Sequence, residues 1–183
     1  GTDPRVAPSL EALAKLAHPD GSIYDKDNAV YVTAISVLAF QGGKVHPELI
    51  APAQAWLAGK QFGSDGKDDP KDVNYGGVGY GIDPKEPEAD LSNLHFALDA
   101  LKDSTIKDKD AVMARAQKFL ERCQNRTESN DQPWAANDGG FVYRPGASKA
   151  GGTASTGSMT YAGIAGFLYA KAAPDDPRVA AAM

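Results

Sequence analysis

A glycine-rich stretch occurs twice in this chain and constrains the fold more than any other feature. Residues 76–80 read Gly-Gly-Val-Gly-Tyr, and residues 139–143, 63 positions further on, read Gly-Gly-Phe-Val-Tyr. A long segment shared at one fixed spacing indicates that a supersecondary unit has been copied. Other residues related by this spacing are Ala34 and Ala97, Leu38 and Leu101, Gln54 and Gln117, Leu57 and Leu120, and Gln61 and Gln124.

Apolar residues at helical spacing predict helices around each copy. Residues 29–41 are apolar on nearly every face, which predicts a buried helix. Asp90 is the predicted cap of a helix with a leucine stripe, and Thr156 or Ser158 opens a further buried helix. The predicted amphipathic helices cover about 9–17, 47–61, with Pro52 either starting or kinking the helix, and 109–124. The spacing of 63, then 66, aligns Tyr31, Ile35 and Leu38 with Leu94, Leu98 and Leu101, and then with Thr160, Ile164 and Phe167.

Each unit therefore reads as a buried helix, an amphipathic helix and a glycine-rich return. Neither helix can bury its apolar face alone, so neighbouring hairpins must stack. We predict an all-α fold in which about three helical hairpins form a partial α/α toroid-type array with long glycine-rich loops. We expect residues 1–183 to be one domain and part of a longer chain. The predicted units are about 9–28, 29–90, 91–155 and 156–183.

The charge, the cysteine content and the lengths of the apolar runs exclude several classes of function. The 183 residues carry a net charge of -5, with 19 basic and 24 acidic residues mixed along the chain, so no basic stripe is offered to nucleic acid. Cys123 is the sole cysteine, which excludes a disulfide within the chain. No apolar run approaches the roughly 20 residues of a membrane-spanning helix. The first residue is Gly rather than Met, which indicates a trimmed chain, so no compartment is predicted.

The repeated stretch and its upstream residues resemble the prenyltransferase and squalene-oxidase repeat family, whose signature is an aromatic-aliphatic pair, a glutamine and a Gly-x-aromatic. This chain has an insert between the glutamine and the glycines, and its final aromatic is Phe or Val rather than Trp. Residues 158–163 also resemble inner helices of bacterial members. The matching segments are Phe119-Leu120 with Gln124 and 139–141, Trp56-Leu57 with Gln61 and 76–78, and a reduced copy in Leu16, His18 and 20–23.

The resemblance implies an α/α toroid, as in terpenoid cyclases and protein prenyltransferase β subunits. The motif itself is interpreted as a joint, because the glutamine side chain can hydrogen-bond the backbone of the glycine turn and tie one hairpin to the next. The duplicated glycine stretch is therefore expected to fasten hairpins together rather than to catalyse a reaction.

The chain contains neither the acid motif of the cyclases nor the zinc-ligand set of the prenyltransferases. The cyclases use an aspartate-rich acid motif, and the nearest string, 108–111, is better explained as the start of a helix. The prenyltransferases hold zinc with Asp, Cys and His, whereas Cys123 lies on a core stripe and His18, His46 and His95 are scattered. The glycines match no nucleotide-binding motif. The sequence predicts no metal and no cofactor.

The strongest candidate chemistry lies on the leucine-striped helix. His95 and Asp99 are four residues apart, which places an imidazole and a carboxylate on one helix face. An acid-base role is one interpretation; a structural helix pair is the favoured one. The spacing aligns His95 with Val32 and Tyr161, so these three residues are the predicted ligand-lining positions.

Three further groups have alternative interpretations. The aspartates within 65–72 suggest a calcium loop or, as favoured, a solvated loop, because lysines interrupt them. Residues 125–127 form a glycosylation sequon. Trp134, Phe141, Tyr143 and Arg144 could recognise a partner or a sugar, although closure of the hairpin is favoured.

We therefore expect a non-catalytic toroid-repeat domain that binds a hydrophobic small molecule or a protein partner on its concave side. The alternative is a part of a terpenoid cyclase or prenyltransferase whose catalytic motif lies outside this chain. Three hairpins form an arc and leave apolar surface uncovered, which predicts self-association or a C-terminal half beyond residue 183.

Overall fold

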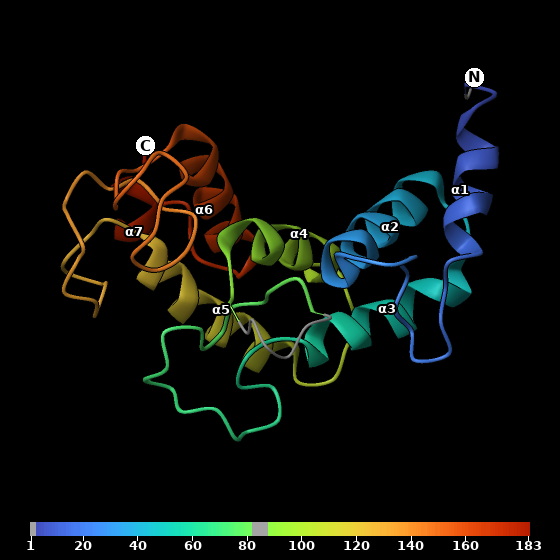
Figure 1. Cartoon of the computed structure of the whole chain (residues 1–183), viewed down its shortest axis with the longest axis horizontal. Helices are drawn as coiled ribbons and strands as arrows, with labels where there is room; N and C mark the ends of the chain where they lie inside the picture. The colour runs from blue at the N-terminus through green and yellow to red at the C-terminus, as the bar shows by residue number, and fades with distance from the viewer. Residues whose placement is uncertain (1–2, 82–87) are drawn as a thin grey trace.

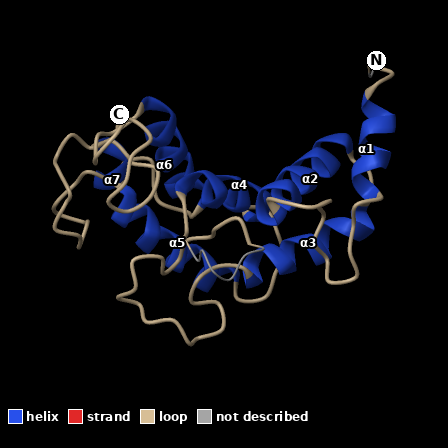
Figure 2. Cartoon of the chain, viewed as in Figure 1, coloured by secondary structure: helices blue, strands red, loops and turns tan. Residues whose placement is uncertain are grey.

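The computed structural model describes residues 3–81 and 88–183; residues 1–2 and residues 82–87, which fall in a predicted glycine-rich loop, lie outside them. The described residues form seven helices and, apart from isolated β-bridges, no strand (Figure 2). The predicted all-α class is confirmed. The helices are α1 (Val6–Ala14), α2 (Ala29–Gly43), α3 (Pro47–Gly59), α4 (Leu91–Leu101), α5 (Lys109–Cys123), α6 (Gly157–Tyr169) and α7 (Pro177–Ala180).

Three helices form one row. Helix α4 packs between α2 and α6, and Figure 1 shows this row along the concave side of a bent array. Helix α3 packs against α2 and α5 packs against α6, so that α3 and α5 lie behind the row. The chain thus alternates between a helix of the row and a helix behind it.

The leucine stripe of α4 lies in the centre of the core. Asp90 caps the helix as predicted, because its Oδ1 accepts a hydrogen bond from the backbone N–H of Asn93 at 2.9 Å. This cap sets the start of the helix and turns one face toward its neighbours. That face is at most 2% exposed and consists of Leu91, Leu94, Leu98 and Leu101.

We expect Leu98→Ala to lower the free energy of unfolding by about 2–5 kcal/mol, because truncating a buried leucine leaves a cavity. Urea denaturation followed by circular dichroism measures this change. The control is Leu168→Ala on α6, where the leucine is 42% exposed and the expected loss is below about 1 kcal/mol. A loss below about 1 kcal/mol for Leu98→Ala would contradict its place in the core.

Two backbone hydrogen bonds define how α2 corresponds to α4. The carbonyl of Tyr80 accepts the N–H of Val30 at 3.2 Å, and the carbonyl of Tyr143 accepts the N–H of Leu91 at 2.8 Å. Val30 therefore corresponds to Leu91, whereas the spacing of 63 pairs Leu91 with Asn28. The predicted register of these two helices is wrong by two residues, because the segment from Leu91 to Gln124 is two residues longer than the segment from Val30 to Gln61.

The glutamine upstream of the first glycine stretch joins two hairpins. Nε2 of Gln61 donates to the carbonyl of Gly76 at 2.9 Å and to the carbonyl of Val112 at 2.9 Å. Its Oε1 accepts a hydrogen bond from Nε of Arg115 at 2.8 Å. Gln61 therefore ties its own glycine turn to α5, the outer helix of the next hairpin.

The second glutamine makes the corresponding contacts. Nε2 of Gln124 donates to the carbonyl of Gly139 at 2.9 Å and to the carbonyl of Arg178 at 2.7 Å. Arg178 belongs to α7, which follows α6 as α5 follows α4. The predicted hydrogen bonds between the glutamines and the glycine turns are confirmed at both places.

The first glycine of each stretch lies against the backbone of the next outer helix. Gly76 has a φ of 85°, and a Cβ added to it would lie 1.8 Å from the carbonyl oxygen of Arg115. Gly139 has a φ of 76°, and its added Cβ would lie 1.8 Å from the carbonyl oxygen of Ala181. Both the left-handed backbone and the close approach therefore require glycine.

The N-terminal segment carries a third contact of this kind. Helix α3 begins at Pro47 and continues through Pro52, so Pro52 does not start the helix. The carbonyl of Pro52 faces Gly21, whose φ is 94° and whose added Cβ would lie 2.6 Å from the carbonyl oxygen. Gly21 lies in the predicted reduced copy, and its contact has the same form as those of Gly76 and Gly139.

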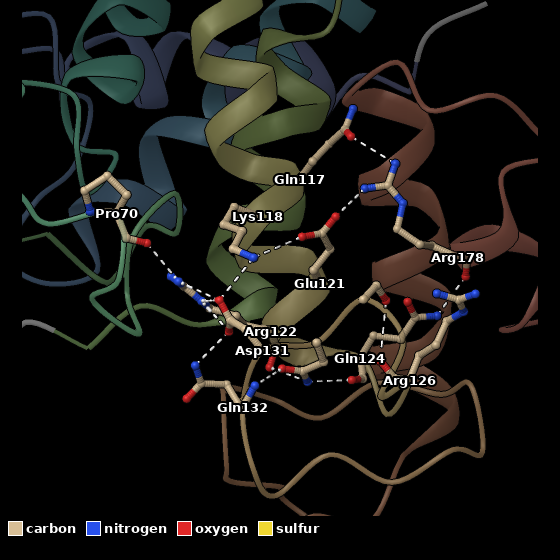
Figure 3. A network of polar contacts seen from close by, with 12 residues as sticks. Pro70, Gln117, Lys118, Glu121, Arg122, Gln124, Arg126, Asp131, Gln132 and Arg178 are labelled. Carbon is tan, nitrogen blue, oxygen red and sulfur yellow. Dashed lines mark hydrogen bonds and ion pairs between the residues drawn. The ribbon is translucent and has the colours of Figure 1, made fainter.

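A buried arginine fastens two loops to α5 (Figure 3). Arg122 is 1% exposed, and its guanidinium donates to the carbonyl of Pro70 at 2.8 Å, to the carbonyl of Asp72 and to the carboxylate of Asp131 at 3.0 Å. These hydrogen bonds hold the pKa of the Asp131 carboxyl well below its usual range. Arg178 of α7 extends the same polar network onto α5.

The first helix differs from its predicted bounds. It covers Val6–Ala14 rather than 9–17, with Pro8 in its first turn, where a helix needs no backbone N–H. Leu16 and Ala17 follow the helix and lead into the turn that contains Gly21. Among the residues described, no helix is both long enough and apolar enough to cross a bilayer.

Candidate functional site

His95 is positioned by the start of α4. The Asp90 cap begins the helix, and Asn93 strengthens it through a second hydrogen bond, from Nδ2 to Oδ2 of Asp90, at 2.7 Å. His95 follows within the next turn and lies half-buried on the flank that packs against α6. The site is therefore held by a capped helix rather than by a loop.

No hydrogen bond joins Asp99 to His95, the two residues of the predicted helix pair, in the part of the chain that the structure describes. Oδ1 of Asp99 accepts a hydrogen bond from Nζ of Lys102 at 2.6 Å, three residues further along the helix. Asp99 affects His95 only through its charge, which raises the pKa of the imidazole. The Lys102 ammonium also lies 4.6 Å from the centre of the Tyr169 ring.

Burial determines the protonation of His95. It lowers the pKa of the imidazole, against the smaller opposing effects of the Asp99 charge and the backbone of Ala162. The imidazole is therefore neutral at pH 7. Its Nδ1 is buried and has no hydrogen-bond partner among the described residues.

Aromatic rings connect the three helices of the row. The ring of Tyr31 on α2 lies 5.0 Å from that of Phe96, and Phe96 lies 5.1 Å from His95. The His95 ring is 6.3 Å from Tyr161 and 5.7 Å from Tyr169, both on α6. We call these five residues the aromatic strip. It is a continuous series of ring contacts from α2 across α4 to α6.

Of the three predicted lining residues, the structure brings two together. His95 and Tyr161 are in ring contact, and the Tyr161 side chain is 70% exposed. Val32 is half-buried on α2, but the corrected register makes it the counterpart of Asn93 rather than of His95. The ring that α2 contributes is that of Tyr31.

Three members of the strip were not predicted to line a site: Tyr31, Phe96 and Tyr169. Tyr31 belongs to a segment that is apolar on nearly every face, and Phe96 lies beside the leucine stripe that marks the core face of α4. A usable signal was present, since each buried helix carries an aromatic residue within its first two turns.

Other predicted groups have structural roles. Asp108 directly precedes α5, so residues 108–111 start a helix as predicted, although the Asp108 side chain makes no capping hydrogen bond. Oδ1 of Asp65, of Asp69 and of Asp72 each accepts the N–H two residues further on, which occupies these oxygens in turns. The buried Cys123 thiol has its pKa raised by burial, as expected for a core position.

The glycosylation sequon is inaccessible. Asn125 is 1% exposed, and its Nδ2 donates to the carbonyl of Thr153 at 3.0 Å and to Oγ of Ser155 at 2.8 Å. Its Oδ1 accepts the N–H of Ala136 at 3.0 Å. Asn125 therefore organises the loops after α5 and cannot accept a glycan in the folded protein.

Comparison with protein-family models, with curated proteins and with solved structures gave no match. The structure by itself defines the chain as an all-α protein with an aromatic strip across three packed helices.

Proposed function

We propose that the chain is a repeat domain of the prenyltransferase and squalene-oxidase type, with about three hairpins in a toroid-type arc. It binds a hydrophobic small molecule, or an apolar segment of a protein partner, along the row of α2, α4 and α6. The residues of this chain bind the ligand without catalysing a reaction.

The repeat assignment is supported by equivalent contacts of glutamines and glycines with backbone carbonyls at two places in the chain, rather than by the overall shape. Gln61 and Gln124 each bond a glycine carbonyl and a carbonyl of the following outer helix. Gly76 and Gly139 each approach a carbonyl of that outer helix in the same way. Such agreement at two separate places is what a duplicated unit requires.

The aromatic strip carries the proposed binding function. Its rings combine apolar faces with partial exposure, which suits recognition of an apolar molecule. Ile35 on α2, Tyr161 and Leu168 are large apolar side chains that are 37%, 70% and 42% exposed. Uncovered apolar surface of this kind favours ligand binding or association with another chain, including a second copy.

A catalytic role for His95 and Asp99 has less support. The carboxylate of Asp99 is engaged by Lys102, so it does not orient the imidazole as the partner of a general base would. The neutral imidazole instead lies flat, at 29°, against the ring of Tyr169. His95 is therefore proposed as one of the rings of the binding surface.

Binding can be measured by displacement of the fluorescent probe 1-anilinonaphthalene-8-sulfonate with farnesol, a linear apolar alcohol. We expect saturable displacement by the unmodified protein and about tenfold weaker farnesol binding by Tyr161→Ala, because exposed aromatic anchors dominate apolar recognition. His95→Ala should weaken binding in the same direction. Since Tyr161 is 70% exposed, its removal leaves the fold intact.

Two matched variants serve as controls. Tyr80→Ala removes a ring that is 48% exposed and makes none of the ring contacts of the strip, and His18→Ala removes an imidazole that contacts Tyr24 instead. Neither should change farnesol binding. The proposal fails if farnesol does not displace the probe, or if the strip variants and the controls behave alike. Turnover of an isoprenoid substrate that His95→Ala abolishes would favour the enzymatic alternative.

A further inference from the structure

A second surface, separate from the aromatic strip, lies where the two glycine-rich stretches end. It is a hollow of about 230 Å³, smaller than the roughly 300 Å³ at which pockets for drug-sized ligands begin. A molecule of about one ring fits this volume. Its polar lining consists of Tyr80, Glu88, Asp90, Tyr143, Arg144 and Lys149.

The two tyrosine hydroxyls in the hollow are joined by a hydrogen bond. Oη of Tyr80 and Oη of Tyr143 are 3.0 Å apart, and either can be the donor. In both arrangements the oxygen of Tyr80 keeps a lone pair that can accept a hydrogen bond from a ligand.

The charges lining the hollow are balanced. Arg144 forms an ion pair with Glu88, and the Lys149 ammonium lies 4.0 Å from the centre of the Tyr143 ring. The remaining acid, Asp90, is 2% exposed and is already bonded to Asn93. A ligand with a net charge of either sign would therefore meet a like charge as well as an opposite one.

We propose that this hollow binds a neutral polyhydroxylated ring, such as a hexose that is free in solution or at the end of a glycan. A sugar hydroxyl both donates and accepts, so it can donate to Tyr80 and accept from Lys149 without disturbing the Arg144–Glu88 pair. The Tyr80 ring, 48% exposed, offers an apolar face to the C–H side of the sugar. Burial raises the pKa of Tyr143, which keeps its hydroxyl protonated as a donor.

The test is a titration of isotope-labelled full chain with glucose, galactose, mannose and their methyl glycosides, followed by two-dimensional NMR. We expect at least one sugar to shift the amide signals of Ala89 and Asp90 saturably at millimolar concentration. Tyr80→Phe should weaken this binding about fivefold, the effect of losing one hydrogen bond. Binding of the free sugar alone points to a soluble ligand, and equal binding of the methyl glycoside points to a terminal residue of a glycan.

Matched variants keep the test decisive. Lys149→Met should weaken binding, whereas Lys171→Met, which removes an exposed lysine paired with Asp110, should not. Tyr24→Phe is the control for the loss of a phenol hydroxyl. Absence of saturable shifts with all sugars overturns the proposal, and so does a response to inorganic phosphate that exceeds the response to every sugar. Both outcomes are independent of farnesol binding at the aromatic strip.

Discussion

Gly76→Ala is expected to lower the free energy of unfolding by about 4 kcal/mol. The added Cβ would lie 1.8 Å from the carbonyl oxygen of Arg115, so the outer helix α5 has to move away from the turn. The left-handed φ of 85° adds backbone strain for any residue other than glycine. Urea denaturation with tryptophan fluorescence measures the loss.

The control separates the steric effect from the backbone effect. Gly66 has a φ of 74°, but no atom lies within 4 Å of its added Cβ. Gly66→Ala should therefore cost only about 1 kcal/mol. Gly139→Ala should match Gly76→Ala, because its Cβ meets the carbonyl of Ala181 at the same distance. Equal losses for Gly66→Ala and Gly76→Ala would show that the close contact with α5 is absent.

Arg122→Met is expected to lower the free energy of unfolding by about 3 kcal/mol. Methionine keeps most of the buried volume, but the carbonyls of Pro70 and Asp72 lose their charged donor, and the loop that carries them loses its attachment to α5. Thermal denaturation measures the global effect. Hydrogen exchange should show faster exchange in residues 64–74.

The same substitution has a predictable pH dependence. Arg122 holds the folded-state pKa of Asp131 below its ordinary value of 3.8, so this interaction stabilises the fold above that pH and is lost as the pH falls further. The difference between the unmodified protein and Arg122→Met should therefore shrink below about pH 4. Lys118→Ala removes a more exposed partner of Asp131, and its loss should stay below about 1 kcal/mol. Comparable losses for the two variants would contradict the role assigned to Arg122.

The contacts between the glutamines and the glycine turns were predictable because both residues of each contact lie in the repeated motif. Gln61 and Gly76 recur as Gln124 and Gly139 at one spacing, and a glutamine amide near a glycine turn has few other buried acceptors. The leucine stripe of α4 was equally readable, because its burial follows from helical periodicity and the Asp90 cap.

The register of α2 was not predictable from the same spacing. Adding or removing a few residues changes the entropic cost of closing a loop only slightly. Equivalent helices can therefore be joined by connections of different length. A helical pattern of apolar residues remains similar when shifted by a few positions, especially in a helix that is apolar on nearly every side. The hydrogen bonds of Val30 and Leu91 are needed to choose the register.

At the candidate sites, several side chains compete for the same partner, and the spacing of two residues alone does not reveal which contact forms. The spacing of His95 and Asp99 permits a pair, but Lys102 offers Asp99 a full positive charge at a favourable helical distance. Arg122 gave no sequence signal, since its partners lie in two separate loops, one 50 and 52 residues earlier in the chain and one nine residues further on. Such residues are identified only when the loops have been placed.

The three contacts between a glycine and a carbonyl determine which substitutions the packing of the helices can tolerate. Gly21, Gly76 and Gly139 each place main chain directly on main chain, so no side chain acts as a spacer at these points. The angle between neighbouring hairpins is thus defined by peptide geometry, which substitution of core residues does not alter. Substitutions that change the size of core side chains therefore leave these three contacts between main chains in place.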